Sequence, residues 1–244
     1  IIWLILLLYA FQSAAVDLRL WATTDVHGAI LSENGGLARI LSLLEEKRSG
    51  DDILIDAGDL YQGSYAAAET RGSIVVNAFN LINYDVFVPG NHDFEFGSAV
   101  LRENLQNINA AILCCNWRFR DPLKNMKPYK IFERNNVRIG IVGVGEKESR
   151  CRIMADDSLL FADEAKSIAS ALAALRREKV DVIVLVRHGG IYFSGGTLYS
   201  LLKIFPEIDI VIGGHSHQTE IGRNIAGAYY VQSGAYGNGV SEIT

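Results

Sequence analysis

The chain contains five histidines, and each lies in a glycine-containing loop that follows an apolar, strand-like segment. The loops read TTDVHG, GNHD, RHGG and GGHSH, and they hold His27, His92, His188, His215 and His217. A single histidine is more often a structural residue than a ligand. In open α/β sheets, however, ligands bind at the loops that leave the carboxyl ends of strands, where the sheet holds the backbone rigidly. Five histidines in this one kind of position therefore indicate a shared functional site.

Two carboxylates and one amide accompany these histidines. Asp25 precedes His27 by two residues, so that both side chains can point the same way from an extended segment, and Asp59 follows another strand. Imidazole, carboxylate and amide groups together suit a borderline or hard divalent cation. The candidate groups at this point are all five histidines together with Asp25, Asp59 and the amide of Asn91. Such a set is larger than one ion needs, which predicts two ions that share a bridging carboxylate.

Apolar strand-like runs alternate with amphipathic helix-like stretches along the chain, a pattern typical of layered α/β proteins. Strands are expected at 18–23, 51–57, 84–88, 110–115, 181–186 and 208–214, and helices at 35–48, 74–82, 98–107 and 162–179. Two asparagines between YKIFER and VRIGIVGV predict a hairpin with a tight turn, so the sheets should be mixed rather than purely parallel. A strand and a second one after it are expected in the segment 228–244.

Length and composition bound the class of protein. A chain of 244 residues, 49% of them hydrophobic and 21% charged, predicts one large, well-packed domain rather than a disordered segment. The net charge is −5 and no run of Lys or Arg is present, which argues against a nucleic-acid polymer as partner, since phosphate backbones are bound through clustered cations.

The segment 1–15, IIWLILLLYAFQSAA, is an apolar run followed by small residues. This pattern is typical of an export signal, with an uncleaved membrane anchor as the alternative. We therefore expect an extracytoplasmic protein whose domain occupies 16–244. The last strands stop before the edge of the sheet is finished, so the chain is expected to be a piece of a longer protein.

The three cysteines, Cys114, Cys115 and Cys151, have a spacing that fits neither a disulfide framework nor a cysteine-based zinc site. Cys114 and Cys115 lie in the strand-like segment AAILCC. Free cysteines in a buried strand behave as small hydrophobic residues, which is the interpretation adopted here.

Six motifs occur in order along the chain, namely TTDVHG, GGLARI, DAGDLYQGS, GNHDFEFG, RHGG and GGHSH. In these motifs, from about Leu18 to the end, the chain resembles the calcineurin-like metallophosphoesterases, and within them the 5'-nucleotidase / 2',3'-cyclic-nucleotide phosphodiesterase group. The resemblance implies a four-layer α/β/β/α sandwich with mixed sheets, and two divalent ions chosen from Zn, Mn, Fe or Co. It implies that Asp25, His27, Asp59 and His217 hold one ion, that Asp59, Asn91, His188 and His215 hold the other, and that Asp59 bridges them.

The resemblance also implies a reaction, the hydrolysis of a small phosphate ester of the nucleotide or cyclic-nucleotide type. The two ions would activate a water molecule, and His92 would contact the phosphoryl oxygens or protonate the leaving oxygen. Glu95 stands where a related family member carries Asp, and it either orients His92 or only solvates the loop. Asp93 is expected to be a structural turn residue.

Two further residues, Arg187 and Gln62, each have two possible interpretations. Arg187 departs from the family pattern directly before a ligand histidine. Because neighbouring side chains of a strand point to opposite faces, it should face away from the metals, unless the strand has already turned and presents it to a substrate phosphate. Gln62 either faces the substrate or stabilises its own turn.

Two other functions are compatible with the same domain. One is that of the thiosulfohydrolase of sulfur oxidation, which acts on a sulfur ester, and the other is that of a catalytically silent binding scaffold. A scaffold should have lost metal ligands, whereas every ligand position is filled here. The exact substrate is left open, since the base-recognising aromatic residues of the family lie in a separate C-terminal domain that this chain does not contain.

Overall fold

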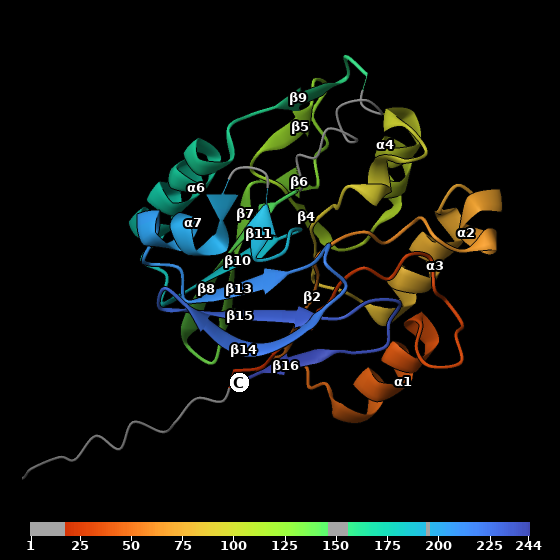
Figure 1. The fold of residues 1–244 in the computed structure, drawn as a ribbon, viewed down its shortest axis with the longest axis horizontal. Coiled ribbons are helices and arrows are strands. Elements are labelled where there is room, and N and C mark those ends of the chain that lie inside the picture. Colours follow the sequence, from red (N-terminus) through yellow and green to blue (C-terminus); the bar gives the residue numbers. More distant parts are fainter. Residues whose placement is uncertain (1–17, 146–155, 194–195) are drawn as a thin grey trace, which may run out of the picture.

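The computed structural model describes residues 18–145, 156–193 and 196–244 (Figure 1). The export segment predicted at 1–15 and Cys151 lie outside these residues. Two six-stranded sheets dominate the fold, with the strand orders β16-β1-β2-β3-β4-β6 and β14-β15-β13-β10-β8-β7.

The first sheet is parallel except for its edge strand β16. Its strands are β1 (Leu20–Thr23), β2 (Ile53–Asp56), β3 (Val86–Phe87), β4 (Ala111–Leu113), β6 (Met126–Lys127) and β16 (Ser241–Ile243). The second sheet is parallel in its centre and antiparallel at both edges. Its strands are β7 (Tyr129–Arg134), β8 (Val137–Val144), β10 (Val182–Arg187), β13 (Ile210–Gly213), β14 (Thr219–Ile225) and β15 (Ala228–Ser233). The prediction of mixed sheets is confirmed.

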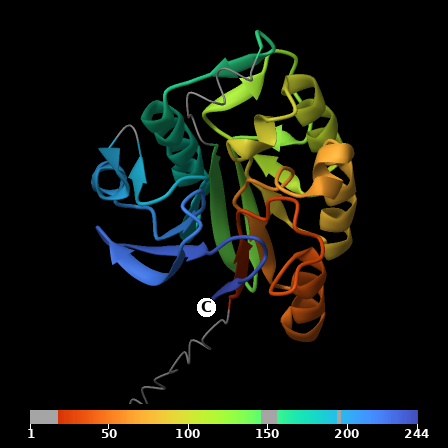
Figure 2. The ribbon, with the colours of Figure 1, turned by 45° about the vertical axis from the view of Figure 1, so that its right-hand side comes forward.

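Helices cover the outer faces of both sheets (Figure 2). The first sheet is covered by α1 (Leu37–Lys47), α2 (Tyr65–Glu69), α3 (Ser73–Ile82) and α4 (Ser98–Asn107), and the second by α6 (Glu164–Glu178) and α7 (Leu198–Ile204). A 3₁₀ turn, η1 (His92–Phe94), precedes α4. The long helices α1, α3, α4 and α6 were all predicted from their amphipathic pattern.

Three clusters of buried hydrophobic side chains separate the layers, and strand β2 shows how one strand serves two of them. Ile53 and Ile55 pack between the two sheets, whereas Leu54 packs against the helices of the first sheet. Successive side chains of a strand point to opposite faces, so a strand that is buried on both faces reads as a continuous apolar run. Burial on both faces therefore explains why ILID in β2 and VIVLV in β10 are almost entirely apolar.

The hairpin predicted around the two asparagines is confirmed. Asn135 and Asn136 have φ angles of 52° and 66°, and Arg134 pairs with Val137 across the turn. Two central residues with positive φ match the twist of an antiparallel hairpin, and asparagine tolerates this conformation better than most residues.

Several short elements were not predicted, including α2, α7, β14 and two small antiparallel sheets. The small sheets pair β5 (Trp117–Phe119) with β9 (Leu159–Phe161), and β11 (Tyr192–Phe193) with β12 (Gly196–Thr197). Strand β14 has no apolar run because most of its side chains are exposed. Among the residues that the structure describes, no helix has the length and apolar character needed to cross a bilayer.

Cys114, which follows β4, is buried as predicted, whereas Cys115 is half-buried. The thiol of Cys114 donates a hydrogen bond to Oδ1 of Asn116 at 3.2 Å. Burial raises the pKa of the Cys114 thiol to about 11, so this group stays protonated and apolar.

A buried carboxylate ties β1 to the turn before β2. Asp52 accepts hydrogen bonds from Nε1 of Trp21 at 2.8 Å and from the N–H and hydroxyl groups of Ser49 at 2.9 and 2.7 Å. Burial opposes ionisation of Asp52, but the donors on Trp21 and Ser49 hold its pKa below the usual range.

We expect Asp52→Ala to lower the free energy of unfolding at pH 7 by about 1–3 kcal/mol, because the indole N–H of Trp21 is left buried without an acceptor. The pKa of Asp52 is depressed in the folded state, so its contribution is present above the unfolded pKa of about 3.9 and is lost as pH falls through the folded pKa. The difference between wild type and variant should therefore shrink below about pH 4. Urea unfolding followed by tryptophan fluorescence at several pH values measures this difference in the free energy of unfolding. A difference that grows as the pH falls would contradict the lowered pKa of Asp52.

Candidate metal centre

Loops from both sheets meet at the edge where their parallel strands end. The N–H groups of Asp25 and His27, after β1, donate to the carbonyl oxygens of Gly58 and Asp59, after β2, at 2.8 and 2.9 Å. The N–H of His215, after β13 in the second sheet, donates to both carboxylate oxygens of Asp25 at 3.0 and 2.9 Å. The two sheets are thus joined at the residues that the sequence analysis selected.

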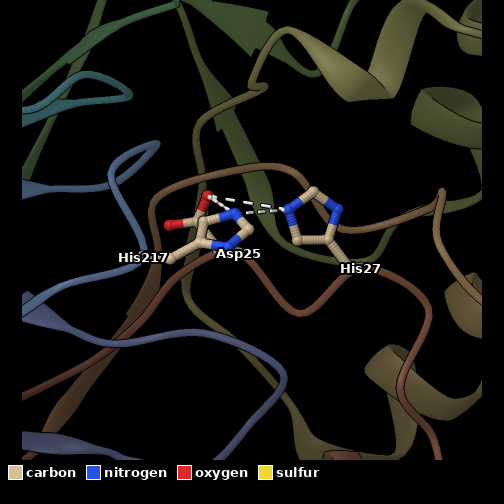
Figure 3. Close-up of side chains that lie close together, drawn as sticks. All are labelled: Asp25, His27 and His217. Carbon is tan, nitrogen blue, oxygen red and sulfur yellow. Dashed lines mark hydrogen bonds and ion pairs between the residues drawn. The ribbon is translucent and has the colours of Figure 1, made fainter.

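Asp25, His27 and His217 form a first candidate metal group, which we call group one (Figure 3). Nε2 of His27 lies 2.9 Å from Nε2 of His217, and Oδ1 of Asp25 lies 3.9 and 3.6 Å from these two atoms. Burial lowers the pKa of His27 despite the opposing charges of Asp59 and Asp25, and a neutral imidazole is the form that binds a metal.

Asp59, His188 and His215 form a second group, called group two, and Asn91 adds an oxygen to it. Nε2 of His188 lies 3.1 Å from Oδ2 of Asp59, and Oδ1 of Asn91 lies 3.2 Å from the same nitrogen and 2.8 Å from Nδ1 of His215. Burial disfavours the charged form of Asp59, but the charge and the hydrogen bond of His188 outweigh it and hold the pKa of Asp59 at about 2. Although burial opposes it, the charge of Asp59 raises the pKa of His188 to about 10, so the two residues form a buried ion pair and metal binding here would release the proton of His188.

Asp59 lies between the two groups. Its Oδ2 atom is 3.1 Å from Nε2 of His188 and 3.9 Å from Nε2 of His27, so one carboxylate faces a histidine of each group. Its Oδ1 atom accepts the main-chain N–H of His92 at 2.7 Å, which fixes the plane of the carboxylate. This is the position that a bridging ligand would need.

Backbone carbonyl groups orient two of the histidines. Nδ1 of His188 lies 2.7 Å from the carbonyl oxygen of Ala57, and Nδ1 of His27 lies 3.0 Å from that of Gln62. In the neutral, metal-binding form of each imidazole, a hydrogen on Nδ1 leaves the lone pair of Nε2 directed into the groups described above. The contact with Gln62 uses its main-chain oxygen, so the two interpretations of the Gln62 side chain stay predictions.

Left-handed backbone conformations are concentrated at the candidate ligands. The φ angles are 52° for Asp25, 50° for His27, 58° for Asp59, 73° for His215 and 57° for His217. Such conformations are unfavourable for residues other than glycine, and they persist where the surrounding structure over-determines them, commonly at functional sites.

Asp93 is buried, and its carboxylate collects four main-chain N–H groups. One oxygen accepts from Asp59 and Gly90 at 3.0 and 2.8 Å, and the other accepts from Leu60 and Tyr61 at 2.8 and 3.1 Å. Burial and the charge of Asp59 raise the pKa of Asp93 to about 7, while these hydrogen bonds oppose the rise. The residue predicted as a structural turn residue therefore also binds the loop of Asp59 to the loop that carries Asn91.

We expect Asp93→Asn to weaken metal binding by about 10- to 100-fold, the usual effect of losing a partner that orients a ligand. The NH₂ group of asparagine cannot accept a hydrogen bond, so two of the four main-chain N–H groups would lose their acceptor. Competition with a fluorescent chelator measures the affinity, and the exposed Asp51→Asn is the matched control. Unchanged metal affinity in Asp93→Asn would refute this role.

His92 lies beside both groups without belonging to either. Its ring centroid is 5.1 Å from that of His27, and its Nδ1 lies 2.5 Å from Oε1 of Glu95. A quarter of the His92 side chain is exposed. The structure thus places Glu95 against His92, as orientation of the imidazole would require.

Arg187 points away from the two groups. The guanidinium is buried, and its Nε donates to Oε1 of Glu164 on α6 at 2.8 Å. The expectation that this side chain faces the opposite side of β10 from His188 is confirmed, so the alternative contact with a substrate phosphate is not supported.

Glycines allow two of these loops to approach closely. A Cβ on Gly90 would collide with the carboxylate of Asp59, and one on Gly214 would collide with the hydroxyl of Thr24.

Tyr236, from the loop after β15, also reaches the site, and its ring centroid lies 5.5 Å from that of His27 and 5.4 Å from that of His217. Sequence reasoning missed Tyr236 because no local pattern distinguishes it from other loop aromatics.

The donor sets fit two divalent cations. In each group the three ligand atoms lie within 4.8 Å of one another, and each set combines imidazole nitrogen with carboxylate oxygen. These donors suit zinc and the other divalent first-row metals, which are also the candidates predicted from the sequence. The groups share Asp59 as a neighbour, so the arrangement suits a pair of ions rather than two independent sites.

Residues 18–219 match the family model described as calcineurin-like phosphoesterase, and the chain belongs to this family of metallophosphoesterases. Among curated relatives, the 5'-nucleotidase of Rattus norvegicus is 27% identical, in an alignment that covers 88% of this chain and 41% of that protein. The chain spans less than half the length of the curated relatives that it matches first.

Solved structures confirm the fold. The calcineurin-like phosphoesterase YfkN from Bacillus subtilis has a TM-score of 0.78 and 23% identity, over 92% of this chain and 83% of that chain. The sulfate thiohydrolase SoxB from Thermus thermophilus has the same TM-score and 19% identity, over 93% of this chain and 53% of that chain. At these identities the likeness concerns the fold, and the predicted metallophosphoesterase fold is thereby confirmed.

Proposed function

We propose that this chain is the catalytic domain of an exported hydrolase that uses two divalent ions to cleave small phosphate esters, nucleotides or cyclic nucleotides in particular. The single observation that carries the proposal is the position of Asp59 between two groups of candidate ligands, with His92 beside them. In this proposal Asp25, His27, Asp59 and His217 hold one ion, and Asp59, Asn91, His188 and His215 hold the other.

When bound, two such ions supply an activated water molecule and neutralise the charge that develops on the phosphoryl group. The side chain of His92 is proposed to act on the leaving group. With Nδ1 of His92 donating to Glu95, Nε2 is the ring atom left to face the ester, and in the protonated imidazole it can donate to the leaving oxygen or to a phosphoryl oxygen. Glu95 is proposed to keep this ring in place.

Export is proposed from the apolar segment 1–15, and one domain is proposed for 16–244. The relatives are more than twice as long as the aligned part, so recognition of the nucleoside is assigned in this proposal to parts of the longer protein, together with the residues of this domain that reach the ester. A nucleic-acid polymer is not proposed as a partner, because the net charge is −5 and the sequence has no run of Lys or Arg.

The sulfur-ester activity remains the alternative that needs an experiment, since SoxB shares the fold. A silent scaffold is disfavoured because all seven candidate ligands are present and come together. One assay separates the three functions. The purified chain is loaded with Zn, Mn, Fe or Co, its metal content is measured, and phosphate and sulfate release are followed separately.

The expected result is two ions per chain and phosphate release from adenosine monophosphate, 2',3'-cyclic adenosine monophosphate or p-nitrophenyl phosphate. Sulfate release from an S-sulfonated thiol, without phosphate release from any ester, would favour the sulfur-ester activity. A chain that binds two ions and releases neither product would favour the scaffold.

A further inference from the structure

Tyr236 is an exposed aromatic residue on the rim of group one. It lies in the loop between β15 and β16, and its ring centroid is 5.5 Å from that of His27 and 5.4 Å from that of His217. Its side chain is nevertheless 46% exposed. One side of the phenol ring therefore contacts two candidate ligands, while the rest of the ring is open to a molecule that enters the site.

Main-chain contacts hold Tyr236 in an unfavourable backbone conformation. Its φ angle is 57°, which a bulky residue rarely adopts, whereas Gly234 and Gly237 in the same loop take positive φ angles without strain. The N–H of Tyr236 donates to the carbonyl oxygen of Asp25 at 2.7 Å, and its own carbonyl oxygen accepts from the N–H of Gly36 at 2.9 Å. The ring is thus presented from a fixed backbone, as expected for a strained residue with a function.

The fold itself makes little use of this side chain. Tyr236 is absent from the three hydrophobic clusters of the described residues, and within the same residues its hydroxyl forms no hydrogen bond. His27, which it contacts, is already oriented by the carbonyl oxygen of Gln62. An exposed, rigid aromatic ring beside a binding site is well suited to contact a ligand, because such a ring offers a large surface at a low cost in conformational entropy.

We propose that Tyr236 is a specificity-determining residue that packs against the planar organic group of the ester, an aryl ring or a nucleobase. The inference rests on the proposed function and adds a substrate contact within this domain. Tyr236 and His92 both contact the ring of His27, at centroid distances of 5.5 and 5.1 Å. A phosphoryl group bound next to His27 would therefore have His92 close to its leaving oxygen and the phenol ring within reach of the attached planar group.

Kinetics of Tyr236→Leu and Tyr236→Phe on matched esters test the inference. Loss of one aromatic contact to a base corresponds to roughly 5- to 100-fold in affinity. For Tyr236→Leu we expect KM to rise by roughly that factor for adenosine monophosphate and p-nitrophenyl phosphate, and to stay within about twofold for ribose 5-phosphate and glycerol phosphate, which lack a planar ring. Tyr236→Phe should retain the wild-type KM values. Tyr229→Leu, which alters a tyrosine that is 56% exposed at the far end of β15, is the control and should change none of them.

Metal content and calorimetric binding of the same phosphates to the metal-loaded chain complete the test. An equal rise in KM for all four esters, or loss of an ion from Tyr236→Leu, would overturn the inference in favour of a residue that positions His217. Equal affinity of wild type and Tyr236→Leu for adenosine monophosphate would overturn it outright. Absence of turnover in the wild type would count against the proposed function alone, because the binding comparison needs no turnover.

Discussion

Asp59→Ala is expected to abolish metal loading at both groups. One carboxylate oxygen of Asp59 lies 3.1 Å from Nε2 of His188 and 3.9 Å from Nε2 of His27, so its removal leaves the ion of group two without a carboxylate ligand and that of group one with Asp25 alone. We expect affinity to fall by more than the 10- to 100-fold that is typical of an outer partner of a ligand. Phosphate release should fall with it. Elemental analysis after dialysis, together with calorimetric titration of the metal, measures the loss.

Two controls make the Asp59 result interpretable. Asp51→Ala removes an exposed carboxylate and should keep both ions. Circular dichroism should show the same helix and strand content in both variants, because the carboxylate of Asp59 contacts the site and not the hydrophobic clusters. If Asp59→Ala lost one ion and kept the other at wild-type affinity, Asp59 would be a ligand of a single ion and the proposed bridge would be wrong.

His92→Ala is expected to separate metal binding from turnover. The side chain of His92 belongs to neither group, and the main-chain N–H that binds Asp59 at 2.7 Å survives the substitution. Both ions should stay bound, while turnover falls by roughly 10²- to 10⁴-fold, the usual effect of removing a positioned proton donor. Steady-state kinetics and metal analysis on the same preparation measure both quantities.

The leaving group gives the His92 prediction a second readout. If His92 acts as an acid, its loss should be less severe for p-nitrophenyl phosphate than for a nucleotide, because p-nitrophenolate departs without protonation. Glu95→Gln should produce a milder form of the same defect, since it weakens the contact with Nδ1 and keeps the imidazole. Loss of an ion from His92→Ala, or full turnover of a nucleotide, would show that the loop 88–97 has a different function.

Much of the site follows from local sequence. A strand that is buried on both faces is a continuous apolar run, so the end of such a run, as in ILID and VIVLV, marks the end of the strand. Polar residues directly after these strands lie at one edge of a parallel sheet. That reasoning selected the five histidines with Asp25 and Asp59, and the family resemblance then separated the metal ligands from His92. The long helices were equally predictable, because each one buries a stripe of side chains with helical spacing.

Other features depend on contacts between distant parts of the chain. His27 and His217 are 190 positions apart, and only the packing of the two sheets brings their Nε2 atoms to 2.9 Å. The left-handed φ angles of the candidate ligands, the four N–H groups around Asp93 and the place of Tyr236 likewise depend on neighbouring loops. The sequence by itself determined which side chains could bind metal and that strand ends would collect them, because burial and periodicity are local properties. Only the tertiary structure sets the distances that gather the donors into two groups around Asp59, the division that the family resemblance implied, because backbone hydrogen bonds and sheet packing there join segments that no local pattern relates.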